Sequence, residues 1–271
     1  MSVIYEPKGR AGEYAGLACN VYETCPHGCT YCFVPGLPHV KAKGWGAEEF
    51  HRPAVARRGI AVGTFELIET EPRPGIVVQV RKELASKRLA GRRDDEVLLC
   101  FCCDAYPVEG EDVTREVLEA FAEVGQRVTV LTKRPVQAVA RDWDLFLGNG
   151  WRLGVSMGCL DSAWIAGHEP GANSLEQRLE ALEAAEKVGI DTWVSCEPSR
   201  PEWVLPVLAC VYLRGVREVK VGRFNHTGEG FDRAGWARVC RELECDEKGV
   251  GRFGGEPSVM RVVVKGGTLV V

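Results

Sequence analysis

The feature that most constrains this chain is an alternation of strand-like and helix-like segments, which is clearest from Asp95 onward. Short apolar and β-branched runs alternate with segments of helical periodicity, a pattern typical of strand–helix units around a parallel sheet. Six strands are predicted, at residues 17–21, 97–102, 127–131, 152–157, 190–196 and 218–221. Such units form either an open doubly wound sheet or a partial barrel. In both folds, functional side chains lie at the carboxyl ends of the strands.

Two of the intervening segments have clear helical periodicity. Residues 113–124 and 174–188 each place a row of apolar side chains on one face. The residues expected at their ends are Asp112 or Thr114 and Gly125 for the first helix, and Asn173 or Ser174 and Gly189 for the second.

The composition is that of an ordinary globular domain. Hydrophobic residues make up 45% and charged residues 27% of the 271 residues, which excludes a disordered, collagen-like or coiled-coil chain. The formal net charge of −4 argues against an extended phosphate-binding surface. We therefore expect a single domain over residues 1–271, with an α/β core at about 15–225 and a short C-terminal β extension at about 226–271.

The ends and loops of the chain carry further expectations. No apolar run approaches the ~18 residues of a membrane span, and residues 1–10 contain no apolar signal region. A cytoplasmic protein without membrane contact is expected. Residues 34–75, rich in Pro and Gly, are expected to form a long functional loop. Residues 260–264 and 268–271 are expected to form a terminal hairpin or an edge strand.

The most informative segment is a triad of cysteines directly after the first predicted strand. Gaps of three and two residues allow all three thiols to turn inward on one short loop, and Gly28 allows tight wrapping by accepting a positive φ. Thiolates are soft ligands that suit iron–sulfur clusters, zinc or copper(I). The members of this triad are Cys25, Cys29 and Cys32.

Three interpretations of the triad remain open from the residues alone. Three ligands on a four-iron cluster leave one iron open, whereas structural zinc requires a closed set of four. Zinc would take His27 or a distant cysteine as its fourth ligand. In the third interpretation the thiols are incidental and buried.

The triad and its surroundings resemble a known family. Cys25-x3-Cys29-x2-Cys32, with an aromatic residue just before the last cysteine, resembles the signature of the radical S-adenosylmethionine (SAM) superfamily. Asn20 and Tyr22, with Pro-His-Gly inside the triad, are similar to the spore photoproduct lyase and DNA-repair-photolyase-like branch. The likeness covers roughly residues 17–200 and includes segments 103–107, 132–133, 155–156, 169–172, 178–179 and 189–190.

This resemblance implies a fold and a chemistry. The fold would be a partial (β/α)6 TIM-like barrel with a [4Fe-4S] cluster and SAM at its top, the cluster bound by the triad. Reductive cleavage of SAM would give methionine and a 5′-deoxyadenosyl radical, which abstracts hydrogen from a substrate. The implied partners are an external electron donor of the flavodoxin or ferredoxin type and a nucleic-acid or nucleobase substrate.

The resemblance also implies residue roles at the strand ends. Lys133 and Ser156 would hold the methionyl end of SAM, because a carboxylate favours a cation and a hydroxyl donor. Asp104 and Tyr31 are further candidates for cofactor binding, and Tyr31 also for catalysis. Arg178 would either bind SAM or neutralise Glu169. Without the resemblance, the alternative is that Lys133 is a solvated lysine at a strand end.

A second group of cysteines follows the second core strand. Alternation places Cys100 and Cys102 on one face, with Cys103 at the mouth of the strand. The resemblance implies a hydrogen-donating cysteine near this strand end without deciding among the three, and burial as small hydrophobes is the alternative. Cys159 and Cys196 follow later strands, where a second cluster is an alternative to single packing.

Other features separate the chain from the lyases or widen the choice of function. In the lyases that the chain resembles, a second hydroxylated ring follows the last cluster cysteine, whereas this chain has Phe33 at that position. Only 24 residues precede the triad. Segments 197–198 and 225–226 follow strands and are expected to face a ligand. A basic run spans residues 81–93. It is either a solvated helix face or a phosphate contact, and in the second case the chain could be a non-enzymatic zinc- or cluster-binding nucleic-acid module.

Overall fold

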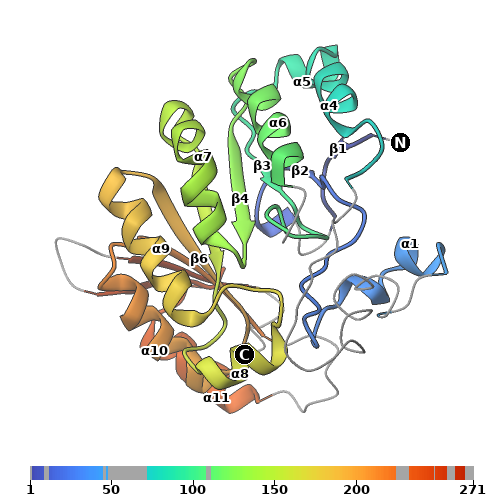
Figure 1. Cartoon of the computed structure of the whole chain (residues 1–271). Helices are drawn as coiled ribbons and strands as arrows, with labels where there is room; N and C mark the ends of the chain where they lie inside the picture. Colours follow the sequence, from blue (N-terminus) through green and yellow to red (C-terminus); the bar gives the residue numbers. More distant parts are fainter. Residues whose placement is uncertain are drawn as a thin grey trace.

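A nine-stranded, mostly parallel sheet that does not close forms the centre of the molecule (Figure 1). The computed structural model describes residues 2–8, 12–44, 47, 72–107, 111–223, 232–246, 248–254 and 260–265, without the side chains of 111 and 112. Its strand order is β1-β2-β3-β4-β5-β6-β7-β9-β8, with antiparallel pairing only at the two edges. The strands are β1 (Ile4–Tyr5), β2 (Leu17–Cys19), β3 (Val97–Leu99), β4 (Val128–Thr132), β5 (Arg152–Ser156), β6 (Asp191–Ser199), β7 (Glu218–Arg223), β8 (Val250–Phe253) and β9 (Met260–Val264).

The six predicted core strands are all present as β2 to β7, with ends that differ by a few residues. They pair in parallel and in sequence order, so their carboxyl ends meet at one edge of the sheet. Most of their side chains are buried on both faces, as expected for a parallel sheet covered by helices. Of the two arrangements predicted from the sequence, an open doubly wound sheet and a partial barrel, the sheet is the partial barrel.

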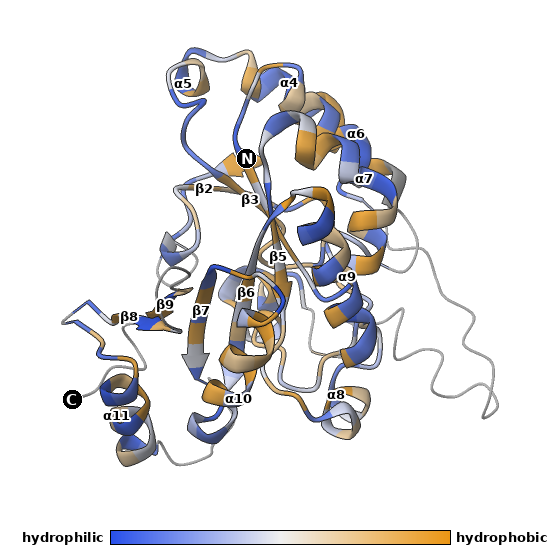
Figure 2. Cartoon of the chain, turned by 90° about the vertical axis from the view of Figure 1, so that its left-hand side faces the viewer, coloured by the Kyte–Doolittle hydropathy of each residue, from blue (hydrophilic) through white to orange (hydrophobic). Residues whose placement is uncertain are grey.

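The helices that connect the strands pack along the outside of the curved sheet, with apolar faces inward (Figures 1 and 2). The described helices are η2 (Val34–Gly36), α1 (Pro38–Lys41), α4 (Ile76–Leu84), α5 (Lys87–Ala90), α6 (Glu111–Ala122), α7 (Pro135–Asn149), α8 (Ser162–His168), α9 (Leu175–Val188), α10 (Pro201–Tyr212) and α11 (Arg233–Glu242). Ser174 forms a capping box with Gln177 at the start of α9, and Gly189 ends α9 at φ +90°. Both ends of α9 therefore match the prediction.

Thr114, in contrast, is not a helix cap. It lies inside α6, fully buried, and its hydroxyl donates to the carbonyl of Ala105 at 2.6 Å. The reason is that α6 begins at Glu111, upstream of the apolar periodicity that suggested the start. The side chain of the alternative cap, Asp112, lies outside the described part of the chain.

The C-terminal segment differs from the predicted hairpin. Strand β9 is not at an edge, because it pairs in parallel with β7 and thereby extends the core sheet. The edge strand is β8, which sequence patterning missed and which pairs antiparallel with β9. Residues 268–271 lie outside the described residues, as do residues 225–226 and most of the predicted 34–75 loop. Within that loop the structure places η2 and α1.

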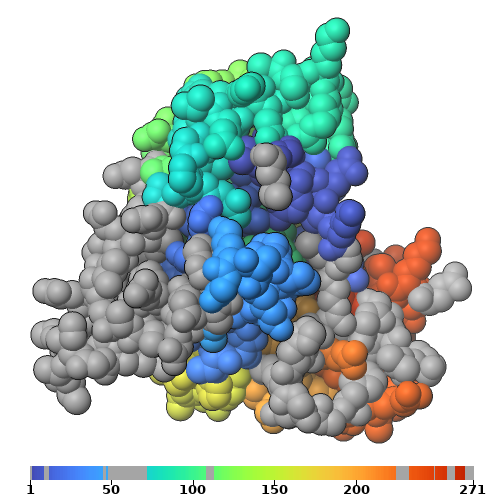
Figure 3. Space-filling view, turned by 90° about the vertical axis from the view of Figure 1, so that its right-hand side faces the viewer, coloured from blue at the N-terminus to red at the C-terminus, as the bar shows by residue number. Residues whose placement is uncertain are grey.

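The segment that directly follows the cysteine triad lies on the outer surface of the molecule (Figure 3). In the view of Figure 3, the blue segment that carries η2 and α1 lies between α4–α5 above and the yellow segment near α8 below. Among the described residues, none of the helices has the length and apolar character needed to cross a membrane.

Candidate active site

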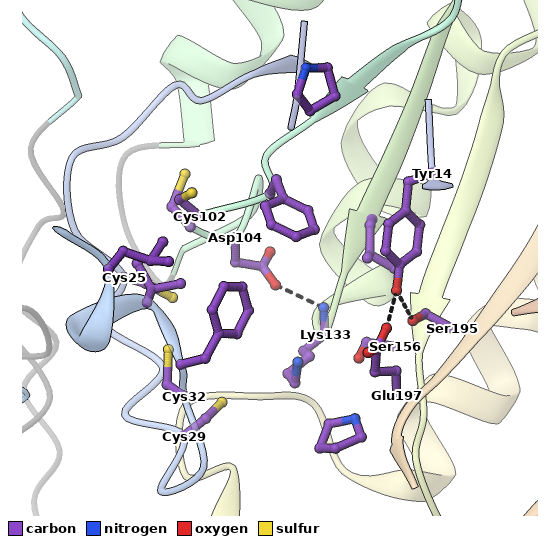
Figure 4. A pocket seen from close by; sticks show the side chains of 18 of the residues that line it. Tyr14, Cys25, Cys29, Cys32, Cys102, Asp104, Lys133, Ser156, Ser195 and Glu197 are labelled. Carbon is purple, nitrogen blue, oxygen red and sulfur yellow. Dashed lines mark hydrogen bonds between the residues drawn. The ribbon is translucent and has the colours of Figure 1, made fainter. Parts of the chain in front are cut away.

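A pocket of about 840 Å³ lies at the carboxyl ends of the parallel strands (Figure 4). Its walls come from the N-terminal segment, the cysteine loop, the ends of β3 to β6 and Lys265 after β9. This volume lies in the range of small-molecule and cofactor sites. The pocket has two ends: the triad end, around Cys25, Cys29, Cys32, Lys133 and Ser156, and the far end, around Tyr14, Ser195, Glu197 and Lys265.

The triad loop is fixed by backbone contacts to the segment after α8. Gly28 adopts φ +63°, which permits the tight turn between the first two cysteines. The N–H of Thr30 donates to the carbonyl of His168 at 3.0 Å, and the N–H of Gly171 donates to the carbonyl of His27 at 2.9 Å. A Cβ on Gly171 would lie 2.5 Å from the Cα of His27, so the close approach requires glycine.

All three triad thiols line the pocket and are protonated without a metal. Burial raises the pKa of Cys25 well above its ordinary value, that of Cys29 to about 12, and that of Cys32 in the same direction. A coordinating metal deprotonates a thiol outright, so binding would release protons. His27 is also buried at the pocket wall, and its Nε2 has no hydrogen-bond partner within the described ranges. The loop thus has soft donors and an orphaned nitrogen, as expected for a site completed by a bound group.

The geometry distinguishes between a single ion and a cluster. Across the described residues, no group of three or more His, Cys, Asp or Glu side chains converges closely enough to hold one metal ion. Tetrahedral zinc requires such convergence, and His27 turns its Nδ1 toward Asp104 at 3.5 Å. A four-iron cluster does not require it, because its thiolates bind different iron atoms. The three sulfurs on one pocket wall therefore fit a cluster better than zinc.

Asp104 is the most heavily bonded acid of the site. It accepts hydrogen bonds from the Thr132 hydroxyl at 2.6 Å, from the N–H of Lys133 at 2.8 Å and from the N–H of Tyr106 at 2.9 Å. Burial would raise its pKa, but these donors and the adjacent His27 hold it below the ordinary value. Burial lowers the pKa of His27 to about 4. At neutral pH the pair is therefore a carboxylate beside a neutral imidazole.

Lys133 lies at the end of β4 and presents its ammonium to the triad end of the pocket (Figure 4). Its Nζ has no ion pair within 4 Å among the described residues and lies 5.8 Å from the centre of the Tyr31 ring. Burial alone would lower its pKa, but Cys29 and Glu169 raise it above the ordinary value. Ser156 is buried at the end of β5 on the same pocket wall. The two residues predicted to hold the methionyl group thus lie on adjacent strands.

Arg178 lies beneath this wall and does not line the pocket. Its guanidinium is fully buried and bonds Glu169, the carbonyl of Ser156 at 2.9 Å and the carbonyl of Asn173 at 3.0 Å. Of the two predicted roles, the geometry corresponds to neutralising Glu169. Tyr31 does line the pocket, and its hydroxyl donates to the other oxygen of Glu169. Burial and Glu169 raise the pKa of Tyr31 well above its ordinary value.

The structure separates the three cysteines after β3. Cys102 and Cys103 line the pocket, whereas Cys100 lies below it, with φ +44°, and its sulfur accepts the N–H of Val21 at 3.5 Å. The half-buried Cys103 thiol is hydrogen-bonded to Cys100. Asn20 accepts the N–H groups of residues 101 and 102, each at 2.9 Å, and so fixes this turn. Besides burial, the neighbouring thiols of Cys103 and Cys32 raise the pKa of Cys102.

Other predicted features lie outside the pocket wall. Cys159 and Cys196 are buried and directed toward the backbone carbonyls of Asp161 and Gly158. The basic run lies on and after α4 and α5, where several of its members are paired: Arg81 with Glu123, Arg88 with Glu83, and Arg92 with Glu6 and Asp95.

Sequence patterning missed most of the far end of the pocket. Glu197 was expected there, but Tyr14, Ser195 and Lys265 were not. Tyr14 precedes β2 and Lys265 follows β9, so no local spacing connects them with β6. The tyrosine hydroxyl donates to Glu197 at 2.7 Å and lies 3.0 Å from the hydroxyl of Ser195 (Figure 4). Lys265 bonds the same carboxylate oxygen.

Comparisons with known proteins place the fold. No family model matches the chain, and no curated protein matches its sequence. Among solved structures, spore photoproduct lyase with bound AdoMet and dinucleoside spore photoproduct aligns with a TM-score of 0.55 at 15% identity, covering 96% of this chain and 71% of the lyase. SuiB of Streptococcus suis bound to S-adenosylmethionine aligns with a TM-score of 0.52 at 10% identity, covering 84% of this chain. The chain spans only 43% of SuiB.

The chain therefore has the partial-barrel fold of radical SAM enzymes. Within that fold, spore photoproduct lyase is a structural neighbour over nearly the whole chain. A second lyase structure, that of a point mutant, aligns equally well, with a TM-score of 0.55 over 97% of this chain.

Proposed function

We propose that this protein is a radical SAM enzyme. The observation that carries the proposal is that three cysteines of a Cys-x3-Cys-x2-Cys loop and the ammonium of Lys133 open into one pocket at the carboxyl ends of parallel strands. The fold shared with two AdoMet-bound enzymes supports the same assignment. Because those identities are 10% and 15%, the site residues and not the fold alone carry the chemistry.

Cys25, Cys29 and Cys32 would hold a [4Fe-4S] cluster. When bound and reduced by an external donor of the flavodoxin or ferredoxin type, the cluster supplies the electron that cleaves SAM into methionine and a 5′-deoxyadenosyl radical. The protein contributes a pocket that would bind both reactants and exclude water from a radical.

Lys133 and Ser156 would bind the carboxylate of SAM. An ammonium without an ion pair is an expensive group to bury and is stabilised by an incoming anion. Asp104, ionised on the adjacent wall, suits the amino group of the same ligand. Arg178 acts indirectly, because it holds the Ser156 carbonyl and Glu169. Tyr31 closes this wall through its bond to Glu169.

Cys102 is the best placed of the cysteines to return a hydrogen atom to a substrate radical. It lines the pocket beside the triad, and its thiol is held protonated because burial raises its pKa to about 12. Cys100 lies below the pocket and Cys103 is engaged with Cys100, so neither reaches the reactants as directly. Phe33 cannot donate a hydrogen atom.

We also propose a class of substrate for this enzyme, namely a nucleic acid or a nucleobase derivative. It is supported by the lyase structure that contains a dinucleoside spore photoproduct. Three members of the basic run, Arg81, Arg88 and Arg92, are paired with acids and are therefore less available to phosphate. If DNA is nevertheless the ligand, its affinity should fall steeply with salt because counterions are released on binding.

Anaerobic reconstitution with iron and sulfide tests the proposal. A brown protein with about four irons per chain is expected. After reduction it should release 5′-deoxyadenosine and methionine from SAM, as detected by chromatography. A colourless protein that binds one zinc, or a four-iron protein that leaves SAM intact after reduction, would contradict it.

A further inference from the structure

A fourth cysteine shares the wall of the triad end. Cys102 lies on the same side of the pocket as the three triad cysteines (Figure 4). It belongs with Cys25 and Cys32 to one small apolar cluster, in which the three cysteines pack against the buried pair Val34 and Val40. Four thiols from two separate segments of the chain therefore meet on one pocket wall.

The turn that carries Cys102 is held in place by its own contacts. Cys100 has φ +44°, a left-handed backbone conformation that is strained in a residue with a side chain. The side-chain oxygen of Asn20 accepts the N–H groups of residues 101 and 102, and its amide nitrogen donates to the hydroxyl of Tyr5 at 2.8 Å. Strain of this kind persists only where the surrounding structure enforces it. The position of Cys102 on the pocket wall is therefore enforced by these contacts.

The two neighbouring cysteines have other surroundings. Cys100 belongs to the main apolar core, and Cys103 packs against the same core. Cys103 is also hydrogen-bonded to Cys100. Within the described part of the chain, neither of them belongs to the apolar cluster that contains two of the triad cysteines. Of the three thiols after β3, that of Cys102 is therefore the one that shares its surroundings with the triad.

Four thiols suit a four-iron cluster in which every iron atom has a protein ligand. The sulfurs do not converge on one point, because among the described residues no group of three or more His, Cys, Asp or Glu side chains could hold a single metal ion. A [4Fe-4S] cluster binds its four thiolates at four different irons. The guanidinium of Arg73 and the amide of Asn20 both favour a thiolate at Cys102. The donor set is therefore that of a complete cluster site.

We propose that Cys102 binds the fourth iron of the cluster while SAM is absent, and that SAM displaces it. This inference rests on the proposed function in one respect, namely that the triad holds a four-iron cluster. The exchange breaks the bond between iron and the Cys102 sulfur and forms a bond from the same iron to SAM, without oxidation or reduction. When SAM binds through its amino group, that group loses a proton and the departing thiolate gains one. The Cys102 thiol thus becomes a hydrogen donor only after SAM has bound.

Cyanide binding to the reduced, SAM-free protein tests this proposal. Cyanide with a labelled carbon binds an iron that lacks a protein ligand, and it then adds a carbon coupling to the paramagnetic resonance spectrum of the cluster. Wild type should exclude cyanide because Cys102 occupies the fourth iron, whereas Cys102→Ala should bind it. Cys103→Ala, at the adjacent cysteine, is the matched control and should exclude cyanide. Cyanide binding to wild type would overturn the proposal, and this measurement needs no variant.

The affinity for SAM gives a second readout. If the closed form makes up about nine tenths of the SAM-free protein, removal of the Cys102 thiol should tighten SAM binding by about tenfold. Equilibrium dialysis with labelled SAM measures this affinity, with the cluster left unreduced so that SAM is not cleaved. Cys103→Ala should bind SAM as wild type does. Unchanged or weaker SAM binding in Cys102→Ala would overturn the proposal, because a ligand that SAM displaces competes with it.

This proposal and the proposed function fail in different ways. A chain that assembles no four-iron cluster, or that leaves SAM intact after reduction, contradicts the proposed function. A chain that cleaves SAM but binds cyanide equally well as wild type and as Cys102→Ala contradicts only the role of Cys102. His27 is the rival ligand, because its Nε2 has no hydrogen-bond partner within the described ranges. Cyanide exclusion that is kept in Cys102→Ala and lost in His27→Ala would assign the fourth iron to His27 and overturn the proposal.

Discussion

The two ends of one pocket are built in different ways. The triad end comes from a single loop, residues 25–32, and from residues at the carboxyl ends of two neighbouring strands, β4 and β5. The far end is assembled from the N-terminal segment, the end of β6 and the residue after β9. Among the described residues, the Lys133 ammonium at the first end has no ion pair within 4 Å, whereas at the second end Lys265 is paired with Glu197. The first end therefore offers a cation that an incoming anion would stabilise, and the second end is held together by its own ion pair.

The largest expected effect is the loss of the triad end as a cluster site. Cys29→Ala should reduce the iron content from about four to near zero and abolish SAM cleavage. The far-ultraviolet circular dichroism should stay unchanged, because Cys29 belongs to none of the apolar core clusters. Cys210→Ala, at a half-buried cysteine on α10, is the matched control and should keep its iron. Full iron and SAM cleavage in Cys29→Ala would show that the triad end is not the cluster site.

The second effect concerns the scaffold beneath the triad end. Glu169→Gln removes the charge opposite the fully buried Arg178 and should lower the free energy of unfolding by about 3–5 kcal/mol at pH 7. Burial would raise the pKa of Glu169, but Lys133 and Arg178 bring it below the ordinary value. The wild-type advantage should therefore be complete above the unfolded pKa of about 4.3 and disappear as pH falls through the folded pKa.

Denaturant unfolding of wild type and Glu169→Gln between pH 7 and pH 3 measures this difference. Glu180→Gln, an exposed counterpart, should stay within about 0.5 kcal/mol of wild type throughout. An advantage that is constant with pH would show that the Glu169 charge is not what stabilises the fold.

The third effect concerns the affinity of the triad end for SAM. Lys133→Ala should weaken SAM binding by about 1.5–3 kcal/mol, because a charge-assisted hydrogen bond is lost. Lys187→Ala, at the exposed end of α9, is the control. Calorimetric titration measures SAM affinity, and an unchanged value in Lys133→Ala would move the methionyl site away from this strand end.

The smallest effect perturbs the far end alone. Gly222→Ala introduces a methyl group against the Glu197 carboxyl and should cost about 1–3 kcal/mol of stability by overpacking. SAM affinity should be kept, because Gly222 lies against the far end and not the triad end. Gly148→Ala, within α7 and with open space around the new methyl, should instead stabilise by up to about 1 kcal/mol. Thermal unfolding checks both variants, and wild-type stability in Gly222→Ala would show that this contact does not constrain Glu197.

Much of the fold was predictable because its signals are local. Most core strands are short runs rich in apolar or β-branched residues. Helix α9 has a capping residue and a terminal glycine, Ser174 and Gly189, that need no tertiary information. The edge strand β8 was missed because Val250–Phe253 contains a glycine and an arginine and has no apolar run. The position of β9 was mistaken for an edge because only its pairing with β7 makes it an interior strand.

The sequence by itself placed the three cysteines of the triad end on one loop, because metal-ligand spacing is a pattern of adjacent residues. Its resemblance to the radical SAM superfamily singled out Lys133 at a strand end. It also placed Glu197 at a ligand-facing strand end. Only the tertiary structure decided that Cys102 and Cys103 face the pocket while Cys100 does not, and that Arg178 supports the wall from beneath. It alone brought Tyr14 and Lys265 to Glu197. The physical reason is that the pairing of β9 with β7 and the docking of the N-terminal segment are tertiary contacts, the second between residues about 200 positions apart, which no local periodicity encodes.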